Sequence, residues 1–222
     1  MFQVAIDGPA GAGKSSIAKA AAKELGFIYI DTGAMYRAIG LKATLSGVEL
    51  SDSAALERMA QSSKISLECT DDGQKIYLDG ENVTEKIRTP EISMAASRVS
   101  AIEGVRKALV ERQRDIAADS NVIMDGRDIG TVVLPKAQVK IFLTASSAAR
   151  AERRCKELTQ KGMAADFETV KREIEERDKN DMTRAASPLV KAPDAQLIDT
   201  TELDLEESIK AVTDHIRNEL KK

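Results

Sequence analysis

Apolar and polar positions alternate along the chain in a way that predicts short strands separated by helices. Compact apolar runs predict strands at residues 2–6, 28–30, 122–124, 139–143 and 196–198. Helical spacing or strong helix formers predict helices at 14–25, 34–45, from about 90, at 102–118, twice between 146 and 184, and at 205–220. This order indicates an α/β fold, in which a mainly parallel sheet has helices on both faces and binds ligands at the carboxyl ends of its strands.

One segment, between residues 63 and 87, departs from this order. Its apolar positions recur at every second residue in two runs, which are Ile65, Leu67 and Cys69, then Ile76 and Leu78. With the turn pair Asp72-Gly73 between the runs, this pattern predicts an antiparallel hairpin. We therefore expect a single domain with a core of residues 1–62, 85–145 and 186–222, a hairpin insertion at about 63–84 and a charged helical excursion at about 146–185.

Composition narrows the class of protein. The 222 residues carry 33 Lys and Arg against 36 Asp and Glu, a net charge of −3, which argues against nucleic acid or an anionic membrane surface as the main partner. Cys69 and Cys155 lie far apart and there is one histidine, so a disulfide scaffold and a Cys/His zinc site are excluded and a reducing cytoplasm fits. No apolar run approaches the ~18 residues of a membrane span, and the N-terminus is unlike a signal peptide.

The strongest motif is a glycine-rich loop between the first predicted strand and the first predicted helix. Residues 8–15 read GPAGAGKS and match the phosphate-binding pattern GxxxxGK[ST] in the place that the pattern requires. Small residues let successive backbone N–H groups point into one concavity, where Lys14 can neutralise the β- and γ-phosphates and Ser15 can offer its hydroxyl to Mg²⁺. The expected ATP-binding residues are Gly8, Pro9, Ala10, Gly11, Ala12, Gly13, Lys14, Ser15 and Ser16.

Several classes of protein use such a loop. A guanine-nucleotide switch would carry an Asn-Lys-x-Asp base reader, yet none of the four asparagines is followed by lysine. A helicase would be larger and would show a basic face. A small-molecule kinase needs only a pocket for the acceptor and a cover that excludes water, and the two excursions have a suitable size for those parts. The favoured interpretation is a kinase, and the alternative is a nucleotide-sensing module without turnover.

Charged side chains follow the other strands at the same edge of the predicted sheet. After residue 30 the chain reads DTGAMYR, where we expect Thr32 to cap the helix and the planar fork of Arg37 to face a phosphate. After residue 124 it reads DGRD, and Asp125 is the expected group to orient Mg²⁺ through its waters. Three further charged residues share one helical face, either as part of a site or as intrahelical salt bridges: Arg177, Asp181 and Arg184.

Together these motifs resemble the bacterial cytidylate kinases, within the nucleoside monophosphate kinase family of P-loop NTPases. The matching segments are IDGPAGAGKSS, IDTGAMYR, AASRVSAIEGVR, MDGRDIGTVV, VKIFLTASS and EERDKNDMTR. The resemblance implies a five-stranded parallel core, a substrate-binding insertion around the hairpin, and a mobile lid around residues 150–184. It also implies ATP with Mg²⁺ as donor and metal, CMP or dCMP as acceptor, and a monomer. The alternative enzyme is a sibling kinase acting on another nucleoside monophosphate or a small alcohol.

Carried over motif by motif, the resemblance implies roles for the site residues. Arg37, Arg127 and Arg184 would hold the acceptor phosphate, Arg177 and Asp181 would lie near the ribose, and the cytosine would be surrounded by Thr32, Ser97, Arg106 and Asp128. The expected catalytic cations are Lys14, Arg127, Arg177 and Arg184, while Asp125 joins the substrate-binding set beside its metal role. The base's hydrogen-bonding pattern adds a hypothesis: Asp128 accepts from the N4 amino group of cytosine and Arg106 donates to O2 or N3, whereas uracil would set O4 against the carboxylate.

Overall fold

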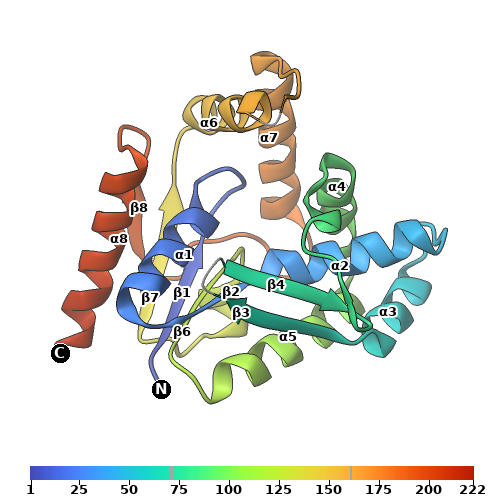
Figure 1. Cartoon of the computed structure of the whole chain (residues 1–222), viewed down its shortest axis with the longest axis horizontal. Coiled ribbons are helices and arrows are strands. Elements are labelled where there is room, and N and C mark those ends of the chain that lie inside the picture. The colour runs from blue at the N-terminus through green and yellow to red at the C-terminus, as the bar shows by residue number, and fades with distance from the viewer. Residues whose placement is uncertain (71–72, 161) are drawn as a thin grey trace.

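The computed structural model of the chain describes residues 1–70, 73–160 and 162–222. Its centre is a five-stranded parallel sheet in the order β2-β6-β1-β7-β8 (Figure 1). The strands are β1 (Gln3–Asp7), β2 (Ile28–Asp31), β6 (Val122–Gly126), β7 (Val139–Thr144) and β8 (Gln196–Asp199). The expected α/β fold with a five-stranded parallel sheet is therefore confirmed.

At its carboxyl end each strand runs one or two residues beyond its predicted apolar run, and the added residues include a polar side chain in every strand. The register pairs Asp31 of β2 with Asp125 of β6, and Asp7 of β1 with Gly126. The carboxyl edge of the sheet therefore carries three closely spaced carboxylates. This edge also bears the loop from β1 into α1 (Lys14–Leu25).

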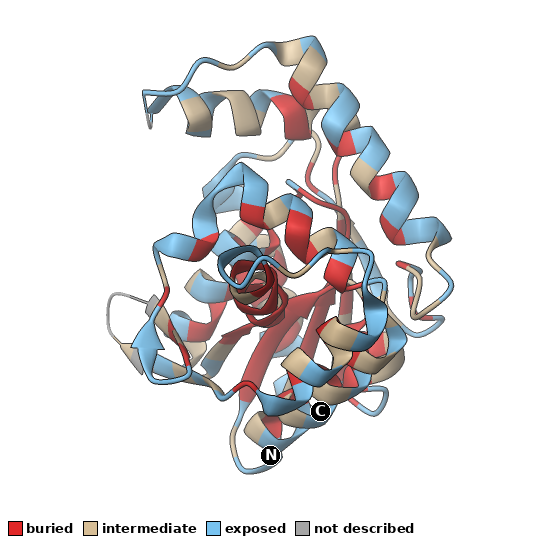
Figure 2. Cartoon of the chain, turned by 90° about the vertical axis from the view of Figure 1, so that its right-hand side faces the viewer, coloured by how far each residue is buried: buried red, intermediate tan, exposed pale blue. Residues whose placement is uncertain are grey.

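Helices cover both faces of the sheet because alternate residues of each strand point to opposite sides. On one face Val4 and Ile6 pack with α1 and α8 (Leu205–Leu220). On the other face Ala5 packs with α5 (Glu103–Ala118) and with a short π-helix, η2 (Ile129–Val133). Figure 2 shows the resulting burial of the central strands.

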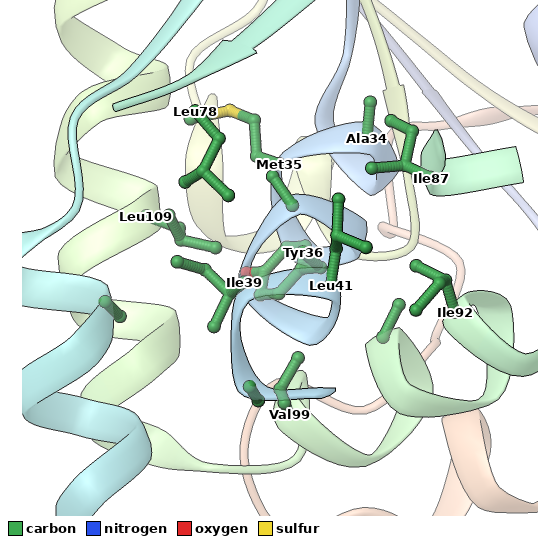
Figure 3. Packing of buried hydrophobic residues seen from close by; sticks show 14 of the residues in the cluster. Ala34, Met35, Tyr36, Ile39, Leu41, Leu78, Ile87, Ile92, Val99 and Leu109 are labelled. Carbon is green, nitrogen blue, oxygen red and sulfur yellow. The ribbon is translucent and has the colours of Figure 1, made fainter. Parts of the chain in front are cut away.

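The predicted hairpin is present, and it belongs to a three-stranded antiparallel sheet of β3 (Ile65–Thr70), β4 (Gly73–Leu78) and β5 (Glu81–Asn82). Asp72 of the predicted turn lies outside the described residues. Ile76 and Leu78 share one apolar core with α2 (Thr32–Leu45), α3 (Ser53–Ser62), the 3₁₀ turn η1 (Lys86–Arg88) and α4 (Pro90–Val99). Figure 3 shows this packing around Met35 and Ile39 of α2. The sequence pattern did not predict α3, η1, η2 or the third strand.

The side chain of Gln74 ties the antiparallel sheet to the parallel one. The carboxamide of Gln74, on β4, accepts from the Asp31 N–H at 3.0 Å and donates to the Tyr29 carbonyl at 2.9 Å. Both backbone groups belong to β2, which lies at the edge of the five-stranded sheet. The hairpin is thus fixed beside the carboxyl end of β2.

The second excursion consists of α6 (Ser147–Gln160) and α7 (Phe167–Thr183), which pack on each other through a small apolar cluster around Ala151 and Ile174. Figures 1 and 2 show these helices standing above the carboxyl edge of the sheet. In the described parts of the chain, no helix combines the length and apolarity needed to cross a membrane.

Candidate active site

The glycine-rich loop has a backbone that only glycine adopts easily. Gly8, Gly11 and Gly13 have φ values of 150°, 75° and 84°. A Cβ at Gly8 would lie 1.9 Å from the Leu143 carbonyl oxygen of β7, so a side chain has no room there. The loop therefore needs glycine both for its shape and for its close approach to the neighbouring strand.

The start of α1 presents backbone N–H groups that are not bonded within the helix. The first intrahelical bond runs from Ile17 N to Gly13 O at 3.0 Å, so the N–H groups of Lys14, Ser15 and Ser16 have no acceptor within the helix. Lys14 is buried, its Nζ donates to the Pro9 carbonyl at 2.6 Å, and burial together with Arg127 lowers its pKa well below the ordinary value. Donors and a desolvated cation at a helix N-terminus form an anion site.

Asp125 stands beside this anion site, as the sequence predicted. Ser15 Oγ donates to its Oδ2 at 2.9 Å, and the Tyr29 hydroxyl donates to its Oδ1 at 2.9 Å. Burial, and then the neighbouring Asp31, raise the pKa of Asp125 to about 6. A hydroxyl and a carboxylate are hard oxygen ligands, so this pair fits Mg²⁺ that takes its other ligands from phosphate and water.

The first turn of α2 corrects one prediction. The helix cap is Asp31, whose Oδ1 accepts from Ala34 N at 2.9 Å, and Thr32 is the first helical residue. The Thr32 hydroxyl donates instead to the Asp125 carbonyl at 2.8 Å. Asp31 also accepts from Arg37 Nη2 at 2.7 Å, so the cap holds Arg37 at the sheet edge. Asp and Thr are both good caps and stand side by side, which is why sequence alone selected the wrong one.

The residues expected to read the base form a buried ion pair with each other. Arg106 Nη2 donates to Asp128 Oδ2, and Arg106 Nη1 donates to the Ser100 carbonyl at 3.0 Å. The Arg106 guanidinium also lies 5.4 Å from the centroid of the Tyr36 ring. Ser97 lies one turn before Ser100 in α4, half-buried, and its carbonyl accepts from the Ser100 hydroxyl at 2.8 Å. Asp128 and Arg106 are thus neighbours as expected, but each already has the other as a partner.

The end of α7 brings the remaining predicted residues to the same place. Arg127 Nε donates to Asp181 Oδ2 at 2.8 Å, and Arg184 lies 3.9 Å from both Asp128 and Asp181. Burial alone would raise the pKa of Asp181, but Arg127 and its neighbours outweigh it and lower the pKa. Burial, and then Arg127, lower the pKa of Arg177 to about 10. The expected intrahelical face is therefore part of a larger charged cluster.

This cluster has more cations than the described residues neutralise. Its carboxylates are Asp31, Asp128 and Asp181, and its arginines are Arg37, Arg106, Arg127, Arg177 and Arg184. Buried donor atoms without a hydrogen-bond partner in the described chain include Nε of Arg37, Arg106 and Arg177, and Nη2 of Arg184. Unpaired buried donors are costly. The cluster is therefore suited to bind an anion with several oxygens.

Several residues at this site were missed by the sequence analysis. Tyr29 and Tyr36 contact Asp125 and Arg106, Ser100 accepts from Arg184, and Arg150 and Asp178 reach the glycine-rich loop. Tyr36 lies inside DTGAMYR and Asp178 inside the charged α7 motif. Both stand next to residues that were predicted for the site, and this position could have indicated them. Ser100 offered no signal beyond its position in a matching segment, and Arg150 offered none beyond its place at the start of the expected lid.

Comparison with known proteins decides the family. Residues 4–218 match the family model for cytidylate kinase. This chain belongs to the cytidylate kinase family. It is 52% identical over 210 residues to the cytidylate kinase of Pelotomaculum thermopropionicum, covering 94% of this chain and 93% of that one. It is 53% identical over 219 residues to the cytidylate kinase of Caldanaerobacter subterraneus subsp. tengcongensis, covering 99% and 96%. The protein is therefore a kinase, and a module without turnover is not favoured.

A solved structure supports the fold at lower identity. An uncharacterized protein from Eubacterium ventriosum aligns over 100% of this chain and 99% of its own length, with a TM-score of 0.54 and 12% identity. At that identity the likeness concerns the fold alone.

Proposed function

We propose that this member of the cytidylate kinase family transfers the γ-phosphoryl group of ATP to CMP or dCMP, giving ADP and CDP or dCDP. The observation that carries the proposal is the pairing of two anion sites at one sheet edge. One is the helix N-terminus with Lys14, and the other is the arginine cluster, several of whose buried donors have no hydrogen-bond partner among the described residues. Ser15 of the helix N-terminus donates to Asp125 at 2.9 Å, and Arg127 of the cluster follows Asp125 by two residues, so the two sites lie side by side at the end of β6.

Charge determines the mechanism that we propose. Donor and acceptor are both phosphates, so the transferred group passes through a transition state with negative charge spread over its equatorial oxygens. The acceptor phosphate is ionised at neutral pH and needs no general base. The catalytic cations would be Lys14, Arg127, Arg177 and Arg184, which stabilise the charge that moves between the two phosphates. Positioning by these fixed cations replaces covalent chemistry by the protein.

Mg²⁺ fits beside the phosphate loop. Ser15 would offer its hydroxyl and Asp125 would orient the hydrated ion, since the two side chains already lie 2.9 Å apart. Bound there, the ion would neutralise charge on the β- and γ-phosphates. The Tyr29 hydroxyl holds the second oxygen of Asp125 and fixes the direction of the carboxylate.

The acceptor would occupy the space between α2, the end of β6 and the end of α7. Arg37, Arg127 and Arg184 would bind its phosphate, with Arg177 and Asp181 near the ribose. The Arg106–Asp128 pair would read the base with Thr32 and Ser97 nearby, which requires the pair to share its remaining donors and acceptors with cytosine. The antiparallel sheet at 63–84 would form the substrate-binding insertion, and residues 146–185 the lid that excludes water.

One assay tests the function. ADP release is measured in a coupled reaction with ATP, Mg²⁺ and, in turn, CMP, dCMP, UMP, AMP, GMP and shikimate. We expect rapid release with CMP and dCMP and far slower release with the others. Fast turnover of another acceptor would reassign the protein to a sibling kinase, and no release with any acceptor would favour nucleotide sensing. A monomeric state, a cytoplasmic location and the absence of a nucleic-acid partner are further parts of this proposal.

A further inference from the structure

Both helices of the α6–α7 excursion contact the apex of the phosphate loop at one residue, Ala10. Arg150 of α6 donates through Nη1 to the Ala10 carbonyl at 2.9 Å, and Asp178 of α7 accepts from the Ala10 N–H at 3.3 Å. Arg150 Nη1 and Asp178 Oδ2 form an ion pair at 2.6 Å, and Arg150 Nε donates to the Ala145 carbonyl at 2.9 Å. One buried ion pair thus holds the peptide groups on both sides of Ala10.

The buried face of α7 changes its chemistry where it reaches the loop. Its inward residues are first apolar, Val170 and Ile174, and then acidic, Asp178 and Asp181. The apolar pair packs on α6, whereas Asp178 pairs with Arg150 and the loop, and Asp181 pairs with Arg127. Burying a carboxylate without a partner is unfavourable. Asp178 and Asp181 can therefore face inward only where their ion-pair partners are in reach. The register of α7 is therefore fixed by two ion pairs one turn apart.

The contact at Ala10 leaves the donors for phosphate free. The N–H groups without an acceptor in the helix are those of Lys14, Ser15 and Ser16, four or more residues beyond Ala10. A Cβ at Gly11 would lie 3.3 Å from Arg150 Cβ, so the side chain of Arg150 also limits the path of the loop between these points. Asp178 can therefore hold the loop while a triphosphate occupies the helix N-terminus.

We propose that Arg150 and Asp178 are positioning residues that join the lid to the phosphate loop and so place Arg177 for phosphoryl transfer. Arg177 precedes Asp178 in α7, so the contacts of Asp178 hold the backbone from which the Arg177 side chain extends. The pair acts through Ala10 and Arg177, not by contact with the reacting atoms. This proposal rests on the proposed function, because Arg177 matters only if a phosphoryl group is transferred at this site.

The test compares two carboxylates of α7 that both contact α6. Asp178→Asn keeps the shape and an acceptor for Ala10 but loses the ion pair with Arg150. The matched control is Glu175→Gln. Glu175 also joins α7 to α6, since it accepts from the Ser147 hydroxyl at 2.8 Å, but this contact does not involve the phosphate loop. We expect Asp178→Asn to lower kcat about tenfold to a hundredfold, the usual result of a misplaced catalytic group, with the KM for ATP within about threefold of wild type. Glu175→Gln should stay within about twofold on both constants.

A double-mutant cycle with Arg150→Met identifies the pair. Since each single variant breaks the same contact, Arg150→Met with Asp178→Asn should be little slower than Arg150→Met alone. Additive losses, or an Asp178→Asn variant with the kcat of Glu175→Gln, would overturn the proposal. A lower melting temperature with unchanged kcat would make the pair structural only, which also overturns it.

A second measurement needs neither turnover nor a folded variant. In the wild-type protein the Ala10 amide should exchange its hydrogen slowly, because Asp178 accepts from it in a buried place. Exchange as fast as in an open loop would disprove the contact itself. If no acceptor is phosphorylated while the Ala10 amide is protected, the proposed function fails and the contact stands, so the two failures are distinguishable.

Discussion

Asp128→Asn provides the sharpest test of how the base is read. The carboxylate is buried between Arg106 and Arg184, with 6% of its side chain exposed. Against uracil, its oxygen would face O4, and two acceptors left together in a desolvated site cost about 1–3 kcal/mol. Wild-type discrimination between CMP and UMP should therefore reach about tenfold to a hundredfold in kcat/KM. The amide of asparagine keeps the shape of the side chain but adds a donor. The variant should therefore turn over CMP more slowly, and its ratio of kcat/KM for CMP to kcat/KM for UMP should fall to a few-fold.

The same substitution has a cost in stability that must be measured separately. Removing the charge leaves Arg106 without its ion-pair partner in a buried place, and breaking such a pair costs about 3–5 kcal/mol. The assay is kcat/KM for both substrates at a temperature where the melting curve shows the variant folded. Asp181→Asn is the control, because it also removes a buried partner of an arginine, while the proposed function places it near the ribose, so kcat/KM should fall alike for both substrates. An unchanged CMP/UMP ratio in folded Asp128→Asn would refute base reading by this carboxylate.

Three further predictions follow from the charges at the sheet edge. Lys14→Ala should lower kcat by orders of magnitude, measured as ADP release, because the ammonium acts on transition-state charge; an unchanged kcat would remove the loop from the mechanism. Arg184→Met should slow phosphoryl transfer while ATP titration of the variant shows nearly wild-type affinity, and an equal loss of ATP affinity would place Arg184 on the donor side. Burial raises the pKa of Asp7 to about 6, above its ordinary 3.8, so the folded state binds the extra proton between about pH 4 and 6. Stability should therefore fall as pH rises through this window, by roughly 3 kcal/mol, and denaturant unfolding of Asp7→Asn should show a flatter profile.

Local signals in the sequence were sufficient for most of the fold. The bounds of α1 agree with the prediction at both ends, because Gly13 and Gly26 adopt left-handed conformations that begin and end the helix. The π-helix η2 could not be predicted in this way. Its first N–H groups, of Ile129 and Gly130, donate to the two oxygens of Asp7 at 2.7 Å, across more than 120 residues of chain.

For the candidate site, the sequence predicted the positions of several residues but not how their charges pair. Spacing and strand ends pointed to Arg37, Arg127 and Asp125, because residue type and position on the sheet edge are local properties. The pairing between charges is not local. Asp128 was expected to be free for the base, yet it pairs with Arg106 of α5, and that pairing depends on how α5 packs near the end of β6.

The Gln74 carboxamide also covers part of an edge of the parallel sheet. β2 is an edge strand, and an open edge offers N–H and carbonyl groups with which the strand of another molecule can pair. The carboxamide of Gln74 occupies the Tyr29 carbonyl and the Asp31 N–H. It thus supplies the donor and the acceptor that a neighbouring strand would supply to β2. The antiparallel sheet is thereby held across an edge that would otherwise be open to self-association. A chain without the β3–β5 sheet would lose this protection, and we expect it to aggregate through the exposed edge of β2.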